Sequence, residues 1–428
     1  MKQVFVKRIA RYLGKRENAL SFGRVRDPRA RRGRRWPKRT LLTVTFVAMV
    51  AMERSFRGAE RLSRDMSGCR KRLGIPRRVP DSTLCDFWSR FTNEAGLRQV
   101  LIDDVKRARR RKALEPTTLP IHVASLDGKT IWCGKRKVKD PACQKMSQEG
   151  HTFYRLHTLH AVLISAVTQP CIDQYLVPKK TNEMGALPTF IDRIQSAYGK
   201  SFIEVVAMDA GMTSAENARH ITGAKMRYAM VVNDAQPNLL EEAERLCGWG
   251  AHKQVNHVRE CATPWERYRG YWVRRELFRS AEIKGWPRWG SARQVWRVKQ
   301  TAKKSDGTIC VSNRYFVTSL PWDRLTGRQI LTLVRLRWGV ENGCHWTLDV
   351  ALGEDRHCWC KTGKALRMLS WIRLLAYNAL RFLRDRYLRS GSNRALPWDE
   401  LRRRLTAALL LPQVWSDHCS ESFVAQDV

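Results

Sequence analysis

Three acidic residues lie in apolar surroundings that are unusual for carboxylates. Asp127 follows the apolar run 121–126, Asp209 follows the apolar run 203–208, and Glu341 lies within an apolar helical pattern. A carboxylate on the buried side of an element is costly unless a cation holds it. In a chain whose formal charge is +39, three such acids suggest a divalent metal site that works on phosphate.

Phosphodiester cleavage is the chemistry that such a site serves. Two Mg²⁺ ions about 3.5–4 Å apart can activate an incoming water or 3′-hydroxyl and stabilise the leaving oxygen. Mg²⁺ prefers oxygen ligands and is usually held by a few carboxylates together with substrate phosphates. We expect Asp127 to bridge the two ions, with Asp209 on one ion and Glu341 on the other, and Mn²⁺ to be able to replace Mg²⁺.

Each acid also has a simpler interpretation. An Asp after a strand can serve a turn or a cap, and Asp209 could cap a helix that starts near Thr213. Glu341 could pair with Arg337 or His345 at helical spacing. Periodicity alone cannot select three residues from 40 acids. The competing acids are Asp173, Asp192, Asp349, Glu354 and Asp355.

The elements that would position these acids form a mixed α/β pattern. Three strand-like runs are followed by helix, strand, helix and strand, which predicts a mixed sheet with flanking helices. Acids at the carboxyl ends of neighbouring strands converge at one edge of a sheet. We therefore expect Asp127 and Asp209 to meet there, and Glu341 to arrive on a helix packed over that edge. The predicted strands are 121–127, 159–167, 171–177, 203–208 and 228–232, and the predicted helices are 186–197 and 214–222.

The rest of the chain divides around this sheet. A Trp-rich insertion at about 238–325 alternates like antiparallel strands and separates the second acid from the third. The helical pattern before the sheet indicates a small domain, for which DNA binding and packing against the next domain are both open. The predicted domains are a basic arm at 1–39, a helical domain at 40–115, the catalytic domain at 116–388, and a linker, short helix and tail at 389–428.

The composition points to a nucleic-acid partner. Lys and Arg number 79 against 40 acids, and a field of this sign attracts polyanions. A hydrophobic content of 43% with 16 Trp excludes a disordered basic tail and argues against a ribosomal or nucleoid structural protein. The longest apolar run, 41–52, is too short to span a bilayer and predicts a core helix. We expect no membrane partner, no signal peptide and a cytoplasmic, nucleoid-associated protein.

Several short sequences resemble the DDE transposases of bacterial insertion sequences, in the H-repeat-associated branch. The resemblance covers roughly residues 20–385 and implies an RNase H-like core with a β insertion before its last catalytic helix. It also implies that Asp127, Asp209 and Glu341 are the acid triad of that family. The sequences that carry it are 26–29, 55–58, Leu126–Thr130, Lys180–Glu183, Met208–Ala210, Tyr228–Pro237 and Arg337–Val350 with Glu354 and Asp355.

The last of these sequences departs from its relatives at two positions. Related elements carry a Tyr-Arg-Glu-Lys signature around the final acid, and Arg337 occupies the Arg position. Val334 stands at the Tyr position and Leu348 at the Lys position, so phosphate contacts assigned to that Tyr and Lys do not carry over. The candidate phosphate contacts are Lys129, Arg337 and His345, of which His345 could equally be a packed helix histidine.

The resemblance predicts a Mg²⁺-dependent transposase. Such an enzyme binds the terminal inverted repeats of an element in double-stranded DNA, cleaves to expose a 3′-hydroxyl, and transfers that strand into target DNA. Two ends must be brought together, so we expect a homodimer on DNA. A domesticated nuclease that cuts without transposition and an inactive DNA-binding relic remain alternatives.

Overall fold

The chain divides into two compact units. The computed structural model describes residues 3–30, 32, 34–248, 259–268, 270–283, 286–388 and 390–411, so the predicted tail from 416 lies outside the described residues. The helical unit comprises Met1–Ala113, Thr130–His157 and Cys344–Val428. The sheet unit comprises Leu114–Lys129 and Thr158–Gly343. Within the described ranges, no helix combines the length and the hydropathy that a bilayer crossing requires.

Two buried helices form the core of the helical unit. The apolar run at 41–52 forms α2 (Lys38–Val50), which is buried continuously from Thr40 to Val50, as predicted for a core helix. It packs against α11 (Gly363–Phe382), which also contacts α5 and α6. Among the described residues, this unit also contains α1 (Gln3–Ala19), η1 (Phe22–Arg24), α3 (Phe56–Asp65), α4 (Ser67–Arg70), α5 (Asp81–Arg90), α6 (Glu94–Arg110), η5 (Thr347–Ala351), η6 (Leu383–Tyr387), α12 (Gly391–Arg394) and α13 (Trp398–Leu410).

The first helix is held by this core and is not a loose extension. The α1 helix packs against α13, and the Tyr12 hydroxyl donates a hydrogen bond of 2.6 Å to the Ala379 carbonyl in α11. A buried ion pair joins Arg373 of α11 to Glu354 at 3.6 Å, with both side chains almost fully enclosed. The predicted basic arm at 1–39 thus begins as packed helix.

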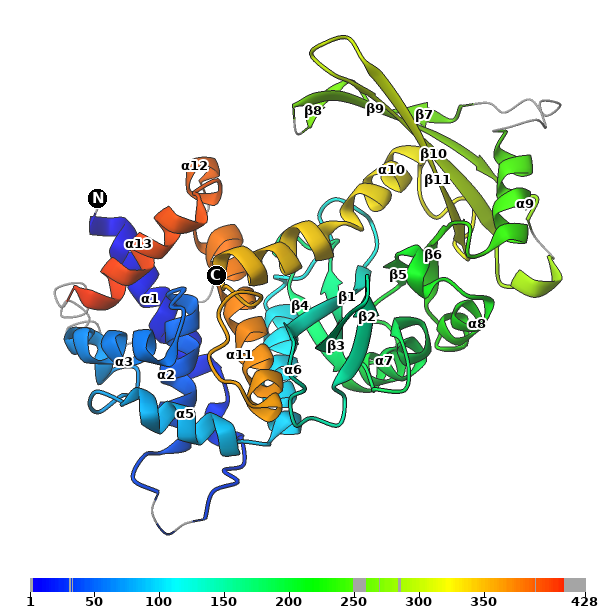
Figure 1. The fold of residues 1–428 in the computed structure, drawn as a ribbon. Helices are drawn as coiled ribbons and strands as arrows, with labels where there is room; N and C mark the ends of the chain where they lie inside the picture. The colour runs from blue at the N-terminus through cyan, green and yellow to red at the C-terminus, as the bar shows by residue number, and fades with distance from the viewer. Residues whose placement is uncertain are drawn as a thin grey trace. The chain divides into compact units, whose positions relative to one another are not determined.

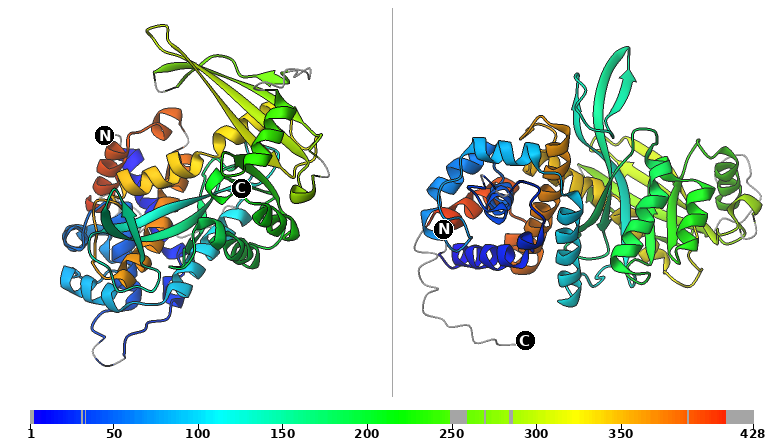
Figure 2. Two further views of the ribbon diagram at one scale, coloured as in Figure 1. Left: turned by 45° about the vertical axis from the view of Figure 1, so that its right-hand side comes forward. Right: turned by 90° about the horizontal axis from the view of Figure 1, so that it is seen from below.

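The central sheet is mixed and has flanking helices, as predicted. Strand β4 pairs with β3, β3 neighbours β1, and β1, β5 and β6 run parallel to one another. Helices α7 (Glu183–Tyr198) and α8 (Ala215–Gly223) connect β4 to β5 and β5 to β6, and Figures 1 and 2 show them beside these strands. The strands are β1 (Val123–Gly134), β2 (Gln144–Gln148), β3 (His151–Leu163), β4 (Cys171–Leu176), β5 (Val205–Met208) and β6 (Arg227–Val232).

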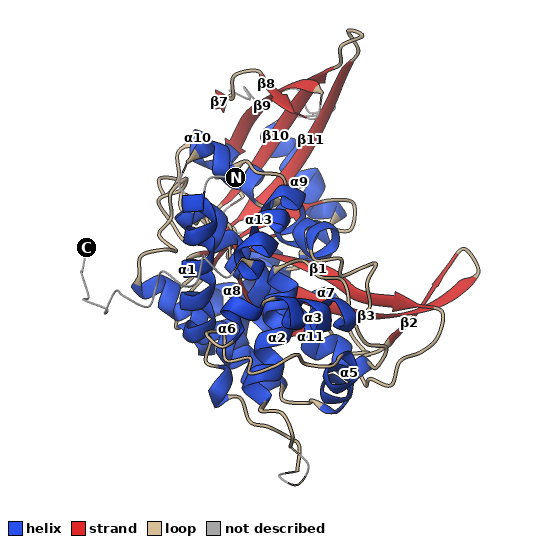
Figure 3. Cartoon of the chain, turned by 90° about the vertical axis from the view of Figure 1, so that its left-hand side faces the viewer, coloured by secondary structure: helices blue, strands red, loops and turns tan. Residues whose placement is uncertain are grey.

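The inserted strands extend this sheet instead of forming one of their own. Strand β11 pairs antiparallel with β6, with Phe316 opposite Val231. Strands β9, β10 and β11 then run side by side, as Figure 3 shows. The insertion comprises α9 (Pro237–Cys247), β7 (Cys261–Ala262), β8 (Glu266–Tyr268), β9 (Tyr271–Ser280), η3 (Pro287–Trp289), β10 (Gln294–Lys303) and β11 (Ile309–Thr318).

Two regions differ from the sequence-based expectation. Strand β2 was not predicted because its side chains are mostly exposed and lack a pattern of alternating apolar residues. The predicted continuous helix from Gly327 to about Val350 is α10 (Gly327–Leu336) followed by two π-helical segments, η4 (Val340–His345) and η5 (Thr347–Ala351). Such segments are rare and frequently occur at functional sites.

Candidate active site

The parallel pairing of β1 with β5 brings the first two acids to one edge. The last paired residues are Leu126 and Met208, so Asp127 and Asp209 are the next residues of their two strands. Asp209 follows the end of β5, as predicted. The prediction that the first strand ends at Asp127 is wrong, because β1 continues to Gly134 beside β3. Asp127 therefore lies at the point where β1 extends beyond its parallel pairing with β5.

The turn after Asp209 leaves its carboxylate available. The helix that follows is capped by Ser214, whose side chain accepts from the Asn217 amide. Only the backbone carbonyl of Asp209 serves the turn η2 (Ala210–Met212), by accepting from the Met212 amide at 3.2 Å. The interpretation of Asp209 as a helix cap is therefore wrong, and half of its side chain is exposed.

Arg337 connects the end of α10 to both strands. Its carbonyl accepts a hydrogen bond of 2.8 Å from the Ser125 hydroxyl, two residues before Asp127 in β1. Its guanidinium, which is only 3% exposed, lies 3.4 Å from the Asp209 carboxylate. Glu341 follows Arg337 by four residues, so Arg337 closes α10 and Glu341 lies in the first turn of η4.

The acids lie close enough to disturb one another's ionisation. Burial and, after it, the nearby carboxylates of Glu341, Glu183 and Asp209 together raise the pKa of Asp127 to about 7, against the opposing effect of the Gly128 amide. Burial also raises the pKa of Glu341, in part against the attraction of Arg337. The structure thus brings together the three acids that the sequence singled out, and adds a fourth.

That fourth acid is Glu183, whose role the sequence left unassigned. It opens α7, next to Asn182, whose side chain caps the helix. The Asn217 side-chain amide donates to the Met184 carbonyl at 3.1 Å and to the Met212 carbonyl at 2.9 Å. This bridge ties the first turn of α7 to η2, the turn that follows β5. The sequence marked this position through the family-like residues 180–183 and through the expectation that Asn182 and Glu183 line the edge of the sheet.

A second cation also acts on the site. The Arg314 guanidinium of β11 lies 4.4 Å from the centre of the Trp338 ring, and Arg337 contacts the same ring at 5.3 Å. Arg314 is exposed and lowers the pKa of Glu341. The insertion therefore contributes a charged group to this edge of the sheet, which the sequence pattern did not indicate.

The donor set suits a hard divalent cation. Carboxylate oxygens are the ligands that Mg²⁺ and Mn²⁺ prefer, whereas Zn²⁺ sites favour Cys and His. Burial, together with repulsion from the neighbouring carboxylates, raises the pKa of Asp127 to about 7, and a bound cation would offset both effects. Asp127, Asp209 and Glu341 therefore fit a magnesium site by their chemistry.

The remaining predicted contacts are less directly placed. Lys129 lies two residues after Asp127 in β1, so the two side chains share a face of the strand, but Lys129 is only 6% exposed. His345 belongs to the helical unit and is 8% exposed, which suits a packed histidine. Val334 and Leu348 are buried apolar residues and offer no phosphate contact. The roles of Lys129 and His345 stay predictions.

The competing acids have other partners or lie elsewhere. The Asp173 carboxylate accepts from the Gln174 amide at 2.9 Å within β4. Asp192 pairs with His220 at 2.8 Å on the outer helices. Neither contributes to the raised pKa of Asp127. The other three competitors belong to the helical unit: Asp349, Glu354 and Asp355.

Comparison with known proteins places the chain in a family. Residues 118–379 match the family described as Transposase DDE domain. This match covers more than half of the 428 residues, and the chain belongs to that family. The matched range includes all four acids of the site.

Individual relatives agree over shorter stretches. An H repeat-associated protein of Escherichia coli (strain K12), YhhI, is 34% identical over 97 residues, which is 23% of this chain and 24% of its own. YncI of Escherichia coli O157:H7 is 32% identical over 90 residues, 21% of either chain. Both names carry the word transposase, and the alignments span about a quarter of these relatives. Among solved structures, a piggyBac transposase synaptic complex with hairpin DNA aligns over 98% of this chain and 80% of its own, with 10% identity and a TM-score of 0.43.

Proposed function

We propose that this chain is a DNA transposase whose catalytic acids are Asp127, Asp209 and Glu341. The observation that carries the proposal is the convergence of these acids from β1, β5 and η4. Burial and the charges of the neighbouring carboxylates together raise the pKa of Asp127 to about 7. Membership of the transposase family and the +39 formal charge support a DNA substrate.

The three acids would hold two Mg²⁺ ions, with Mn²⁺ as a substitute. When bound, the ions would supply Lewis-acid activation of the attacking oxygen and stabilisation of the leaving oxygen. Loading the site requires Asp127 to lose its proton, which a cation favours and the neighbouring carboxylates oppose. Glu183 adds to the negative potential that attracts the cation.

The cations of the chain would order these carboxylates and meet the DNA. Buried Arg337 pairs with Asp209 at 3.4 Å and ties it to β1 through the Ser125 contact. Arg314 is exposed beside Glu341 and could contact a phosphate without leaving the Trp338 ring. Lys129 would contribute positive charge from the same face of β1 as Asp127.

The reaction that follows from this site has two stages. The first is hydrolysis at the ends of an element to expose a 3′-hydroxyl, and the second is in-line attack of that hydroxyl on target DNA. Two ends must be held at once for the product to form, so we propose a homodimer on the terminal inverted repeats. A nuclease that performs only the first stage is the second candidate, because the same acids serve both.

Replacement of single acids tests the site. Asp127→Asn, Asp209→Asn and Glu341→Gln should each abolish Mg²⁺-dependent cleavage of a duplex carrying the element ends, while leaving its binding intact. Asp192→Asn is the matched control, because it removes an exposed carboxylate paired with His220 outside this site. Cleavage retained by the Asp127→Asn variant would contradict the assignment of Asp127 to the catalytic site.

A strand-transfer assay separates the two candidate reactions. Pre-cleaved ends with a free 3′-hydroxyl are incubated with the full chain, Mg²⁺ and a supercoiled plasmid. Joined products favour the transposase, whereas cleavage of ends without any joining favours the nuclease.

A further inference from the structure

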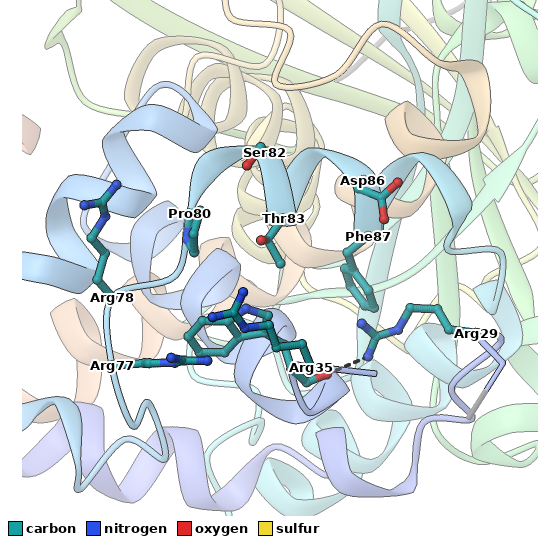
Figure 4. A pocket seen from close by; sticks show the side chains of 10 residues that line it. Arg29, Arg35, Arg77, Arg78, Pro80, Ser82, Thr83, Asp86 and Phe87 are labelled. Carbon is teal, nitrogen blue, oxygen red and sulfur yellow. Dashed lines mark hydrogen bonds between the residues drawn. The ribbon is translucent and has the colours of Figure 1, made fainter. Parts of the chain in front are cut away.

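A basic pocket of about 640 Å³ lies in the helical unit, far along the sequence from the acids. The segment before α2 forms one wall, the residues before α5 form another, and the first turns of α5 complete it (Figure 4). Four arginines and a single acid line it. The arginines are Arg29, Arg35, Arg77 and Arg78, and the acid is Asp86.

Two of the arginines build the walls. Arg29 donates to both oxygens of Asp27, at 3.0 and 2.9 Å, and to the Trp36 carbonyl at 2.8 Å. Arg78 donates to the Glu60 carboxylate at 2.7 Å. Their charges are thus matched by carboxylates, and their contacts order the segment before α2 and the approach to α5.

The other two arginines of the pocket carry charges that a bound anion can neutralise. Arg35 and Arg77 are exposed, and across the described residues neither has a carboxylate partner. Arg77 lies 4.8 Å from the centre of the Trp36 ring, which holds its guanidinium in the pocket. The acid of the pocket, Asp86, is paired with Arg90 at 2.8 Å.

The start of α5 adds neutral donors to these charges. Pro80 precedes the helix and offers no side-chain cap. The Asp81 amide donates to Glu60 at 3.1 Å. Within the described ranges no acceptor meets the amides of Ser82 and Thr83, and both residues line the pocket. Unsatisfied amides at a helix start, aligned with the helix dipole, favour an anion.

We propose that this pocket binds a phosphodiester of the double-stranded DNA backbone. Arg35 and Arg77 supply the charge, and the first turn of α5 supplies amides and hydroxyls. The aromatic residues do not compete for a base, because Trp36 is 6% and Phe87 1% exposed. A pocket that offers hydrogen-bond donors but no exposed aromatic ring face contacts the DNA backbone and does not distinguish base sequence.

The open volume favours a duplex over a small free anion. A single phosphate would fill only part of about 640 Å³, whereas a DNA backbone passing across the pocket can reach both arginines and the helix start. The inference rests on the proposed function, since it takes DNA as the substrate. It adds a contact that is separate in sequence from the acids and independent of their chemistry.

Salt dependence of binding tests the proposal. Fluorescence anisotropy measures DNA binding by the full chain. The double variant Arg35→Gln/Arg77→Gln is compared with the wild type, on a duplex that carries an element end and on an unrelated duplex. Each lost phosphate contact lowers the slope of log K against log salt by about 0.9, so the slope should fall by about two on both duplexes. The matched control combines Arg402→Gln and Arg403→Gln, which removes two charges that are paired within α13. A slope equal to that control, or a loss confined to one duplex, overturns the proposal.

A chemical footprint distinguishes the sources of the phosphate. Phenylglyoxal modifies accessible arginines, and mass spectrometry reports the extent at Arg35 and Arg77. Either duplex should protect both residues, and millimolar inorganic phosphate should not; equal protection by inorganic phosphate overturns the assignment to DNA. Arg77→Lys keeps the positive charge and should therefore retain most of the DNA binding. This retention distinguishes the loss of a phosphate contact from a loss of folding.

The two proposals fail in different ways. If the wild type cleaves DNA and the pocket variants bind with an unchanged salt slope, only the pocket assignment falls. If the wild type neither binds nor cleaves DNA, the proposed function falls.

Discussion

Neutralising Asp127 should stabilise the metal-free protein. The pKa of this carboxyl is raised from 3.8 to about 7 by burial and by its acidic neighbours. In the unfolded chain the same group ionises near its ordinary pKa. Ionisation at neutral pH is therefore opposed in the folded state, and Asp127→Asn removes that cost.

The size and sign of the effect follow from linkage. Three pKa units correspond to about 4 kcal/mol, which we halve because Asp127 is partly exposed and solvent screens its neighbours. We expect Asp127→Asn to gain about 2 kcal/mol at about pH 8. The wild type holds its full stability below the unfolded pKa and loses this amount as the pH rises through about 7. The gain should therefore vanish near about pH 4.

Urea unfolding in EDTA measures the difference. Wild type, Asp127→Asn and the control Asp192→Asn are compared at several pH values, following the transition of the sheet unit. Addition of Mg²⁺ should stabilise the wild type by about 1.4 kcal/mol for each tenfold excess over its Kd, and the Asp127 variant much less. An Asp127 variant that is less stable than the wild type at high pH in EDTA, or a gap independent of pH, would refute the reasoning.

Three further variants test the surroundings of the site. Glu183→Gln removes a charge that raises the pKa of Asp127, so Mn²⁺ binding followed by calorimetry should weaken by about fivefold; unchanged affinity would exclude Glu183 from the site. Arg337→Leu removes the cation that lowers the pKa of Glu341, so the rise of the cleavage rate should move to higher pH, and an unmoved pH–rate profile would contradict this. Glu354→Gln leaves Arg373 buried without its partner, which should cost about 3 kcal/mol in thermal unfolding; the double change to Leu and Met should recover most of it, and a Glu354→Gln variant as stable as the wild type would refute the role of the pair.

The sheet could be predicted because its signals are local. The apolar run before Asp209 and the alternation of strands with helices define a parallel strand whose end carries an acid. The same argument misplaced the end of β1. Polar residues beyond Asp127 continue β1 beside β3, and no local sequence pattern indicates that pairing.

The rest of the site depends on contacts between distant segments. Arg314 comes near Glu341 because β11 pairs with β6, with Phe316 opposite Val231. Glu183 joins the acids because Asn217 bridges two turns. Neither the register of an inserted strand nor a side-chain bridge follows from hydrophobic periodicity. The hydrogen bond from the Ser125 hydroxyl to the Arg337 carbonyl could not be predicted from the sequence for the same reason.

The wide separation of the acids along the chain has a consequence for protein synthesis. Asp127 and Asp209 leave the ribosome long before Glu341, and β11 must dock on β6 before Arg314 can approach the last acid. A nascent or truncated chain therefore carries an attractive surface for DNA but an incomplete set of carboxylates. Under the proposed function, cleavage requires all three acids, so it would arise only after translation has passed η4.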